Sequence, residues 1–108
     1  MSDMINSNLT KVPDGNKCGS VRVTIASNVG QGNGGTELPC KMVWMVAASA
    51  NTGDVRFRVG AVCTAITGEP MPKFGTNNYR IWLPIDDVSK LYFYGSVDAD
   101  VVDITFTR

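Results

Sequence analysis

Histidine is absent from this chain of 108 residues, and its absence removes most enzyme mechanisms. Histidine is the commonest general base near neutral pH, the usual partner of a nucleophilic serine, and a preferred ligand of zinc and non-haem iron. A triad hydrolase and a histidine-ligated oxygenase on β-strands are therefore excluded. We expect no catalytic residue, no metal site and no cofactor.

Net charge is absent as well, since ten basic residues balance ten acidic ones. Proteins that bind a nucleic-acid groove normally carry a surplus of Lys and Arg, which displaces counterions from phosphate. No apolar run approaches the roughly 20 residues that a membrane span needs, and the N-terminus lacks the basic and apolar regions of a secretion signal. We expect a soluble, non-exported protein that binds neither nucleic acid nor membrane.

The chain has three cysteines, Cys18, Cys40 and Cys63, and an odd number cannot pair completely within the chain. Their wide spacing also lacks the Cys-x-x-Cys pattern of zinc and redox sites. Cys40 and Cys63 stand in largely apolar sequence, and the chain has no histidine that could lower the thiol pKa. We therefore expect reduced thiols in a cytosol, with these two buried and inert.

A glycine-rich segment, Gly30 to Gly35, satisfies the G-x-G-x-x-G pattern of dinucleotide-binding proteins. In those proteins a helix follows the glycines, and its N-terminus faces the pyrophosphate. Here Thr36 to Pro39 and an apolar strand follow instead. The sequence therefore predicts a flexible loop between strands over residues 28–39 and no nucleotide site.

Acidic residues gather at Asp98, Asp100 and Asp103, and again at Asp86 and Asp87. Calcium loops need about six oxygen ligands at a defined spacing, which neither group provides. Solvated turns are the favoured interpretation of both. A hydrolase that uses a carboxylate pair, such as Asp86 with Asp98, stays an open alternative.

Short apolar and alternating runs recur along the chain with Gly, Pro, Asn and Asp between them, at 21–26, 40–48, 55–59, 62–67, 79–86, 91–94 and 102–106. Alternation with a period of two is typical of half-buried strands. The Asn51 to Asp54 turn signal predicts a hairpin between the second and third runs. The spacing predicts an all-β protein, an antiparallel β-sandwich of jelly-roll type. Residues 1–18 are polar and predict an extended N-terminal arm, with the sandwich domain at 19–108.

Two features predict surfaces that need covering. The run from Met42 to Ala47 is apolar on both faces, and Trp82, Tyr92 and Tyr94 fall on faces expected to point outward. Aromatic side chains with little charge around them are enriched in the centres of protein interfaces. The protein-interface candidates are Met42, Trp44, Met45, Trp82, Tyr92 and Tyr94. Coverage of these side chains within the chain itself is the alternative.

The stretch from Leu38 to Phe106 resembles small β-sandwich proteins encoded among the virion genes of tailed phages. The likeness consists of strand openers and turns: Leu-Pro-Cys-Lys at 38–41, Asn-Thr-Gly at 51–53, Val59-Gly60, Gly-x-Pro-Met-Pro at 68–72, and the run from Ile85 to Gly95. The resemblance implies a capsid decoration or cement protein on the capsid surface of a virion, assembled in the host cytoplasm. It further implies a homo-oligomer, dimer or trimer, that clamps neighbouring subunits of the major capsid protein.

A carbohydrate-binding or receptor-binding module of a phage fibre or tail is the rival interpretation. In that case Trp82, Tyr92 and Tyr94 would stack on sugar rings beside Asp and Asn side chains.

Overall fold

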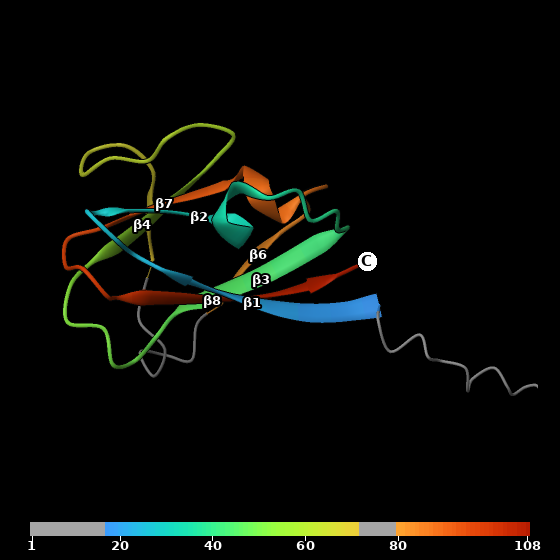
Figure 1. The fold of residues 1–108 in the computed structure, drawn as a ribbon, viewed down its shortest axis with the longest axis horizontal. Helices are drawn as coiled ribbons and strands as arrows, with labels where there is room; N and C mark the ends of the chain where they lie inside the picture. Colours follow the sequence, from blue (N-terminus) through green and yellow to red (C-terminus); the bar gives the residue numbers. More distant parts are fainter. Residues whose placement is uncertain (1–16, 72–79) are drawn as a thin grey trace, which may run out of the picture.

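The computed structural model describes residues 17–71 and 80–108, which form strands joined by loops and short 3₁₀ turns (Figure 1). The strands are β1 (Cys18–Thr24), β2 (Val29–Gln31), β3 (Met42–Ala47), β4 (Val55–Val59), β5 (Glu69–Met71), β6 (Ile81–Leu83), β7 (Leu91–Gly95) and β8 (Val101–Thr107). The turns are η2 (Gly32–Gly35) and η3 (Val88–Lys90). The all-β prediction is confirmed. Within these ranges, no helix has the length and apolar character needed to span a bilayer.

The strands form two antiparallel sheets, in the orders β1-β8-β3-β6 and β2-β7-β4-β5. Every connection except the one between β4 and β5 passes from one sheet to the other. This interleaving of two four-stranded sheets is the topology of a jelly roll. The predicted sandwich of jelly-roll type is therefore confirmed.

The core lies between the sheets and is built by alternate residues of each strand. In β8, Val102, Ile104 and Phe106 point inward and are at most 3% exposed, as the alternation predicts. Their inward partners in the same sheet include Val43 and Met45 of β3, both completely buried. Burying a side chain of this size stabilises the fold by about 1.5–3 kcal/mol.

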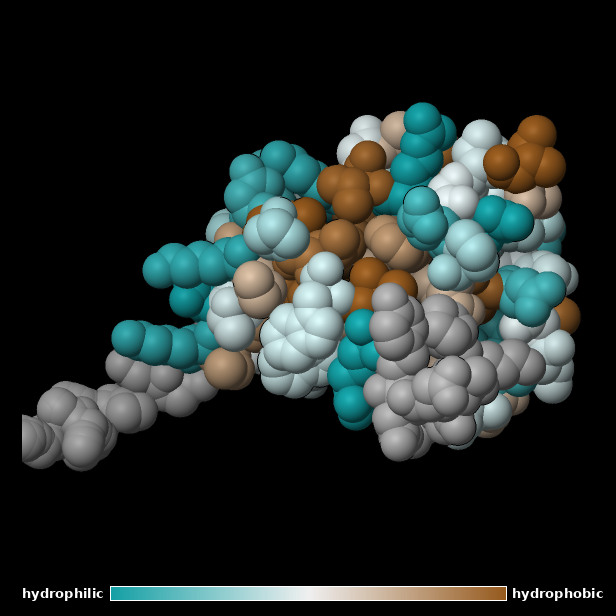
Figure 2. All heavy atoms as spheres, turned by 180° about the vertical axis from the view of Figure 1, so that it is seen from behind, coloured by the Kyte–Doolittle hydropathy of each residue, from teal (hydrophilic) through white to brown (hydrophobic). Residues whose placement is uncertain are grey.

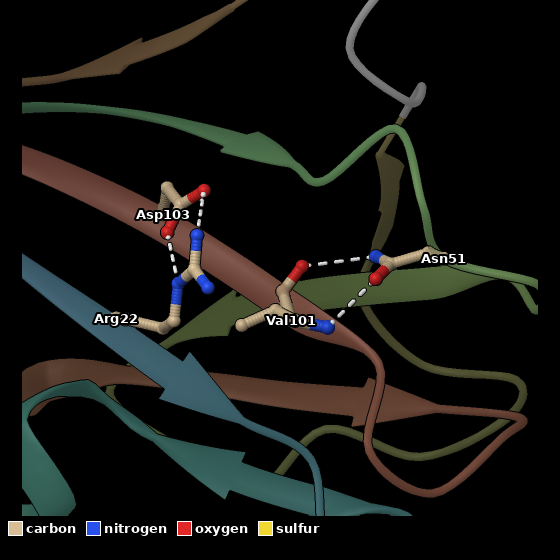
Figure 3. A network of polar contacts seen from close by, with 4 residues as sticks. All are labelled: Arg22, Asn51, Val101 and Asp103. Atoms are coloured by element: carbon tan, nitrogen blue, oxygen red, sulfur yellow. Dashed lines mark hydrogen bonds and ion pairs between the residues drawn. The ribbon is translucent and has the colours of Figure 1, made fainter.

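The predicted hairpin between residues 40–48 and 55–59 is wrong. β3 pairs with β6 and β8, whereas β4 pairs with β5 and β7, so residues 48–54 cross between the sheets. The side chain of Asn51 explains this path (Figure 3). Its amide nitrogen donates to the Val101 carbonyl at 2.9 Å, and its oxygen accepts the Val101 N–H at 2.8 Å. The turn-forming residues are thus tied to the start of β8 and do not close a hairpin.

A buried carboxylate completes this attachment. Asp100, 5% exposed, accepts hydrogen bonds from the N–H groups of Thr52 at 3.2 Å and Gly53 at 2.8 Å. The Ser96 hydroxyl accepts a further hydrogen bond from the Asp54 N–H at 2.9 Å. The crossover loop therefore satisfies its backbone donors with side chains from the β7–β8 connection.

Three other boundaries differ from the sequence expectation. Residues 62–67 were expected as a strand and form a loop, because Gly60 and Gly68 flank them with φ of 82° and 106°. The loop expected over residues 28–39 contains β2, a short strand at the end of its sheet. β1 begins at Cys18, inside the predicted arm of residues 1–18; the rest of that arm, apart from Lys17, lies outside the described residues.

Candidate functional site

The outer face of the sheet β1-β8-β3-β6 carries both tryptophans of the chain. Trp44 and Trp82 lie opposite each other in the β3–β6 ladder, with ring centroids 4.5 Å apart and ring planes tilted by 51°. Trp82 is 56% exposed, as its place on the polar side of the predicted strand indicated. A cross-strand aromatic pair of this kind fixes both rings relative to the sheet.

A hollow of about 520 Å³ adjoins Trp44 on this face, and we call it the Trp44 hollow. Its lining includes the apolar side chains of Trp44, Val46 and Val101 and the polar side chains of Arg22, Asp103 and Thr105. Figure 2, which shows the molecule from behind, has hydrophobic side chains in the middle of the surface and hydrophilic ones around them. The lining of the Trp44 hollow is therefore partly apolar and partly polar.

Two charged side chains on neighbouring strands form the polar wall of the hollow (Figure 3). Arg22 of β1 lies directly opposite Asp103 of β8. Its Nε and Nη2 donate to the two carboxylate oxygens at 2.8 and 3.3 Å. This hydrogen bonding, followed by the negative charge of Asp103, raises the pKa of Arg22 above its usual value. The pair is exposed, so it contributes little to stability but holds both groups in a defined orientation.

The outer face of the second sheet is partly covered by the loop 60–68, at the top of Figure 1. Arg56 donates to the Gly68 carbonyl at 3.0 Å, and Arg58 donates to the Val62 carbonyl at 3.2 Å. Cys63, 2% exposed, lies within this loop and lines the same hollow as Tyr92. The outward-facing tyrosines of β7 are therefore half-buried.

The same loop presents Val62 (59% exposed) and Ile66 (89%) to solvent, and Val29 of β2 (49%) is exposed on the same side of the sheet, opposite Tyr94. We call these three aliphatic side chains the Ile66 surface. Val29 and Val62 line one hollow of about 350 Å³. The sequence did not reveal this surface, because residues 62–67 were interpreted as a strand. The glycines that flank the loop are the signal that could have revealed it.

A compact set of hydrogen bonds holds the tip of this loop. The hydroxyls of Thr64 and Thr67 are 2.7 Å apart, and the Thr64 N–H donates to the Thr67 hydroxyl at 3.0 Å. The Cys63 thiol donates to the Thr67 carbonyl at 3.1 Å. Ile66 is thus presented on a turn that is ordered by its own side chains.

The six predicted interface residues do not form one surface. Met45 is completely buried in the core and is removed from the candidates, because the inward side of β3 carries it. The other side of β3 faces outward, and its side chains lie on the same face of the sheet as Trp82. The outward set on this sheet is Met42, Trp44 and Trp82, whereas Tyr92 and Tyr94 lie on the opposite face of the sandwich. Trp82 and the tyrosines therefore cannot stack on one sugar.

The acidic residues singled out in the sequence have structural partners. Asp86 forms an ion pair with Lys90 at 2.7 Å, and Asp98 accepts the Asn28 N–H at 3.2 Å. Asp87 accepts from the N–H of Leu38, at 2.9 Å, and from both the N–H and the hydroxyl of Ser89. These hydrogen bonds, that from Leu38 first, hold the pKa of Asp87 below its usual value. Across 17–71 and 80–108, no three His, Cys, Asp or Glu side chains group as metal ligands would.

The cysteines and the glycine-rich segment have structural roles. Cys40 and Cys63 are buried, as predicted, and burial raises the pKa of both thiols, whereas Cys18 is exposed. Gly32 lies directly against the backbone of Val88, so a Cβ atom there would overlap the Val88 carbonyl oxygen. The close approach of η2 to η3 thus accounts for a glycine at this position without a nucleotide.

Comparison of the chain with protein-family models, with curated proteins and with solved structures gives no match. The functional assignment must therefore come from the surfaces of the sandwich and from the sequence resemblance. Two surfaces stand out, the Trp44 hollow on one sheet and the Ile66 surface on the other. They face in opposite directions.

Proposed function

We propose that this chain is a non-enzymatic structural protein of a phage virion, a decoration protein that stabilises the head by binding neighbouring subunits of the major capsid protein. The observation that carries the proposal is the Ile66 surface, in which Val62 and Ile66 of the hydrogen-bonded loop 60–68 and Val29 of β2 expose aliphatic side chains. The jelly-roll fold and the resemblance of residues 38–106 to phage virion proteins support the same class of function.

The chemistry of the Ile66 surface suits protein docking. Ile66 is 89% exposed, and removing such a side chain from water at a partner surface gains about 1.5–3 kcal/mol. The hydrogen bonds between Thr64 and Thr67 order the turn in advance, which lowers the entropic cost of binding. A contact of this size is weak by itself, but a capsid lattice presents many copies and multiplies it.

Assembly of the chain as a dimer or trimer is part of the proposal. β1 is the outermost strand of its sheet and has seven residues. Within the described part of the chain, only β8 pairs with it, so its other edge can accept a strand of a second copy. Light scattering of the purified protein at several concentrations measures the oligomeric state directly, and a monomer throughout would contradict this part.

Rebinding to capsids that have been stripped of their decoration tests the central part of the proposal. We expect the wild-type protein to rebind and Ile66→Asp to lose at least about tenfold in affinity, because a charge replaces the apolar anchor. Val97→Asp is the matched control, since Val97 is also an exposed aliphatic residue, 38% exposed, but lies in the β7–β8 connection. Equal rebinding by Ile66→Asp and the wild type, or no rebinding by either, would refute the proposal.

A further inference from the structure

The Trp44 hollow has no role in the proposed docking, because it lies on the sheet opposite the Ile66 surface. We propose that this hollow is a saccharide-binding site, in which a pyranose ring stacks on Trp44 and its hydroxyl groups bind Arg22 and Asp103. A capsid protein attached through the Ile66 surface would present this site to the surrounding solution. The geometry of the hollow supports this site independently of the capsid assignment.

The size of the hollow fits a small ligand. Its volume of about 520 Å³ lies inside the range of about 300–1,000 Å³ that is typical of small-molecule sites. Three neighbouring strands form its floor, since Arg22, Asp103 and Val46 follow one another across β1, β8 and β3, and residues 48–50 and Arg80 complete its lining. Side chains on paired strands are held more precisely than side chains on loops.

Trp44 provides the apolar part of the site. A pyranose ring has a face of C–H groups, and the negative face of an indole ring attracts them. Trp44 lies opposite Thr105 in the β3–β8 ladder, two residue pairs along from the pair of Val46 and Asp103, so the two pairs share a face of the sheet. Its other neighbour is Trp82, at 4.5 Å between centroids, which holds the indole in place before any ligand binds. Little conformational entropy is therefore lost when a ring stacks on it.

Arg22 and Asp103 provide the polar part. Adjacent hydroxyl groups of a sugar both donate and accept hydrogen bonds, so they need an acceptor and a donor side by side. The guanidinium has donors beyond the two that Asp103 accepts, and each carboxylate oxygen has a second lone pair. Because the two charges cancel, the ion pair does not demand a charged ligand.

The same ion pair argues against an apolar protein segment as the occupant. Covering Arg22 and Asp103 with apolar atoms would remove water from both charges without replacing its hydrogen bonds, which is costly. A saccharide replaces that water with hydroxyl groups. Arg80 also lines the hollow, so sugars with and without a carboxylate belong in the test.

The two tryptophans make the test direct, because the chain contains no others and its intrinsic tryptophan fluorescence reports only on this surface. The wild-type protein is screened on an array of neutral and uronic-acid oligosaccharides, and each binder is titrated by fluorescence and calorimetry. We expect at least one oligosaccharide to bind and to change the fluorescence. Trp44→Ala and Asp103→Asn should each weaken binding by about tenfold or more.

Tyr92→Ala is the matched control, since it removes an aromatic side chain from the opposite face and should leave saccharide affinity unchanged. Asp103→Asn preserves the shape of an exposed side chain and so keeps the test valid if Trp44→Ala fails to fold. The proposal is overturned if no oligosaccharide changes the fluorescence, or if Asp103→Asn binds as well as the wild type. It is also overturned if Trp44→Ala abolishes capsid rebinding, which would make the hollow a protein-docking site. Loss of capsid rebinding in Ile66→Asp, with saccharide binding retained, separates the two functions.

Discussion

The substitution Asn51→Ala tests how the crossover between the two sheets is held. The Asn51 side chain makes two hydrogen bonds to the backbone of Val101, at 2.9 and 2.8 Å, and the residue is only 5% exposed. Alanine removes both bonds. The Val101 carbonyl keeps the hydrogen bond from the Ala48 N–H at 3.0 Å, whereas the Val101 N–H loses the partner that Asn51 supplies.

The expected cost follows from these two different losses. An N–H left without a partner costs about 1–3 kcal/mol, and the loss of one of two bonds to a carbonyl costs about 0.5–1.5 kcal/mol. The sum, about 1.5–4.5 kcal/mol, is a large fraction of the roughly 5–15 kcal/mol by which domains of this kind are stable. Since about 1 kcal/mol shifts the melting temperature of a domain of this size by about 4–8 °C, we expect a fall of at least about 6 °C.

Urea unfolding followed by circular dichroism measures this change in the free energy of unfolding. Asn33→Gly is the control, because the Asn33 amide makes one exposed hydrogen bond, to the Thr36 carbonyl at 3.0 Å, and glycine accepts the φ of 53° at this position; its cost should be under about 1 kcal/mol. If Asn51→Ala is no more destabilising than Asn33→Gly, Asn51 does not hold the crossover and the reasoning is refuted.

Three further predictions concern packing, thiol reactivity and pH. Gly32→Ala should lower the free energy of unfolding by about 1–3 kcal/mol, because the new methyl group overlaps the carbonyl of Val88; an unchanged urea midpoint would contradict this. Of the three cysteines, Cys18 alone should react with iodoacetamide in the folded protein, and mass spectrometry should find a second label only after unfolding. Asp87→Asn should destabilise at neutral pH but not in acid, because the folded pKa of this carboxyl is lowered. The contribution of Asp87 is complete above its usual pKa of 3.8 and disappears as the pH falls through the lower folded value; a difference that persists in strong acid would refute it.

The sequence predicts the parts of the fold that depend on local periodicity. Alternation along residues 102–106 identifies the inward side of β8, and alternation around Trp82 places that ring on the outer face. These predictions succeed because a strand exposes alternate residues to the two sides of its sheet, whatever its neighbours are.

Pairing between distant segments is what the sequence does not predict. Residues 51–54 have the composition of a hairpin turn, but their partners Asp100 and Val101 are nearly 50 residues further along the chain. The contact between Trp44 and Trp82 depends in the same way on the β3–β6 register. Met45 was misassigned because a strand that is apolar on both sides does not itself indicate which side faces the core.

The position of this protein on a virion is the claim that matters most, and electron cryomicroscopy of capsids decorated with the purified chain tests it most directly. The proposal predicts density for the sandwich on the capsid, with Ile66 against a major capsid protein subunit and the Trp44 hollow facing solvent. Density with Trp44 and Trp82 against the capsid, or capsids that bind no chain, would contradict it.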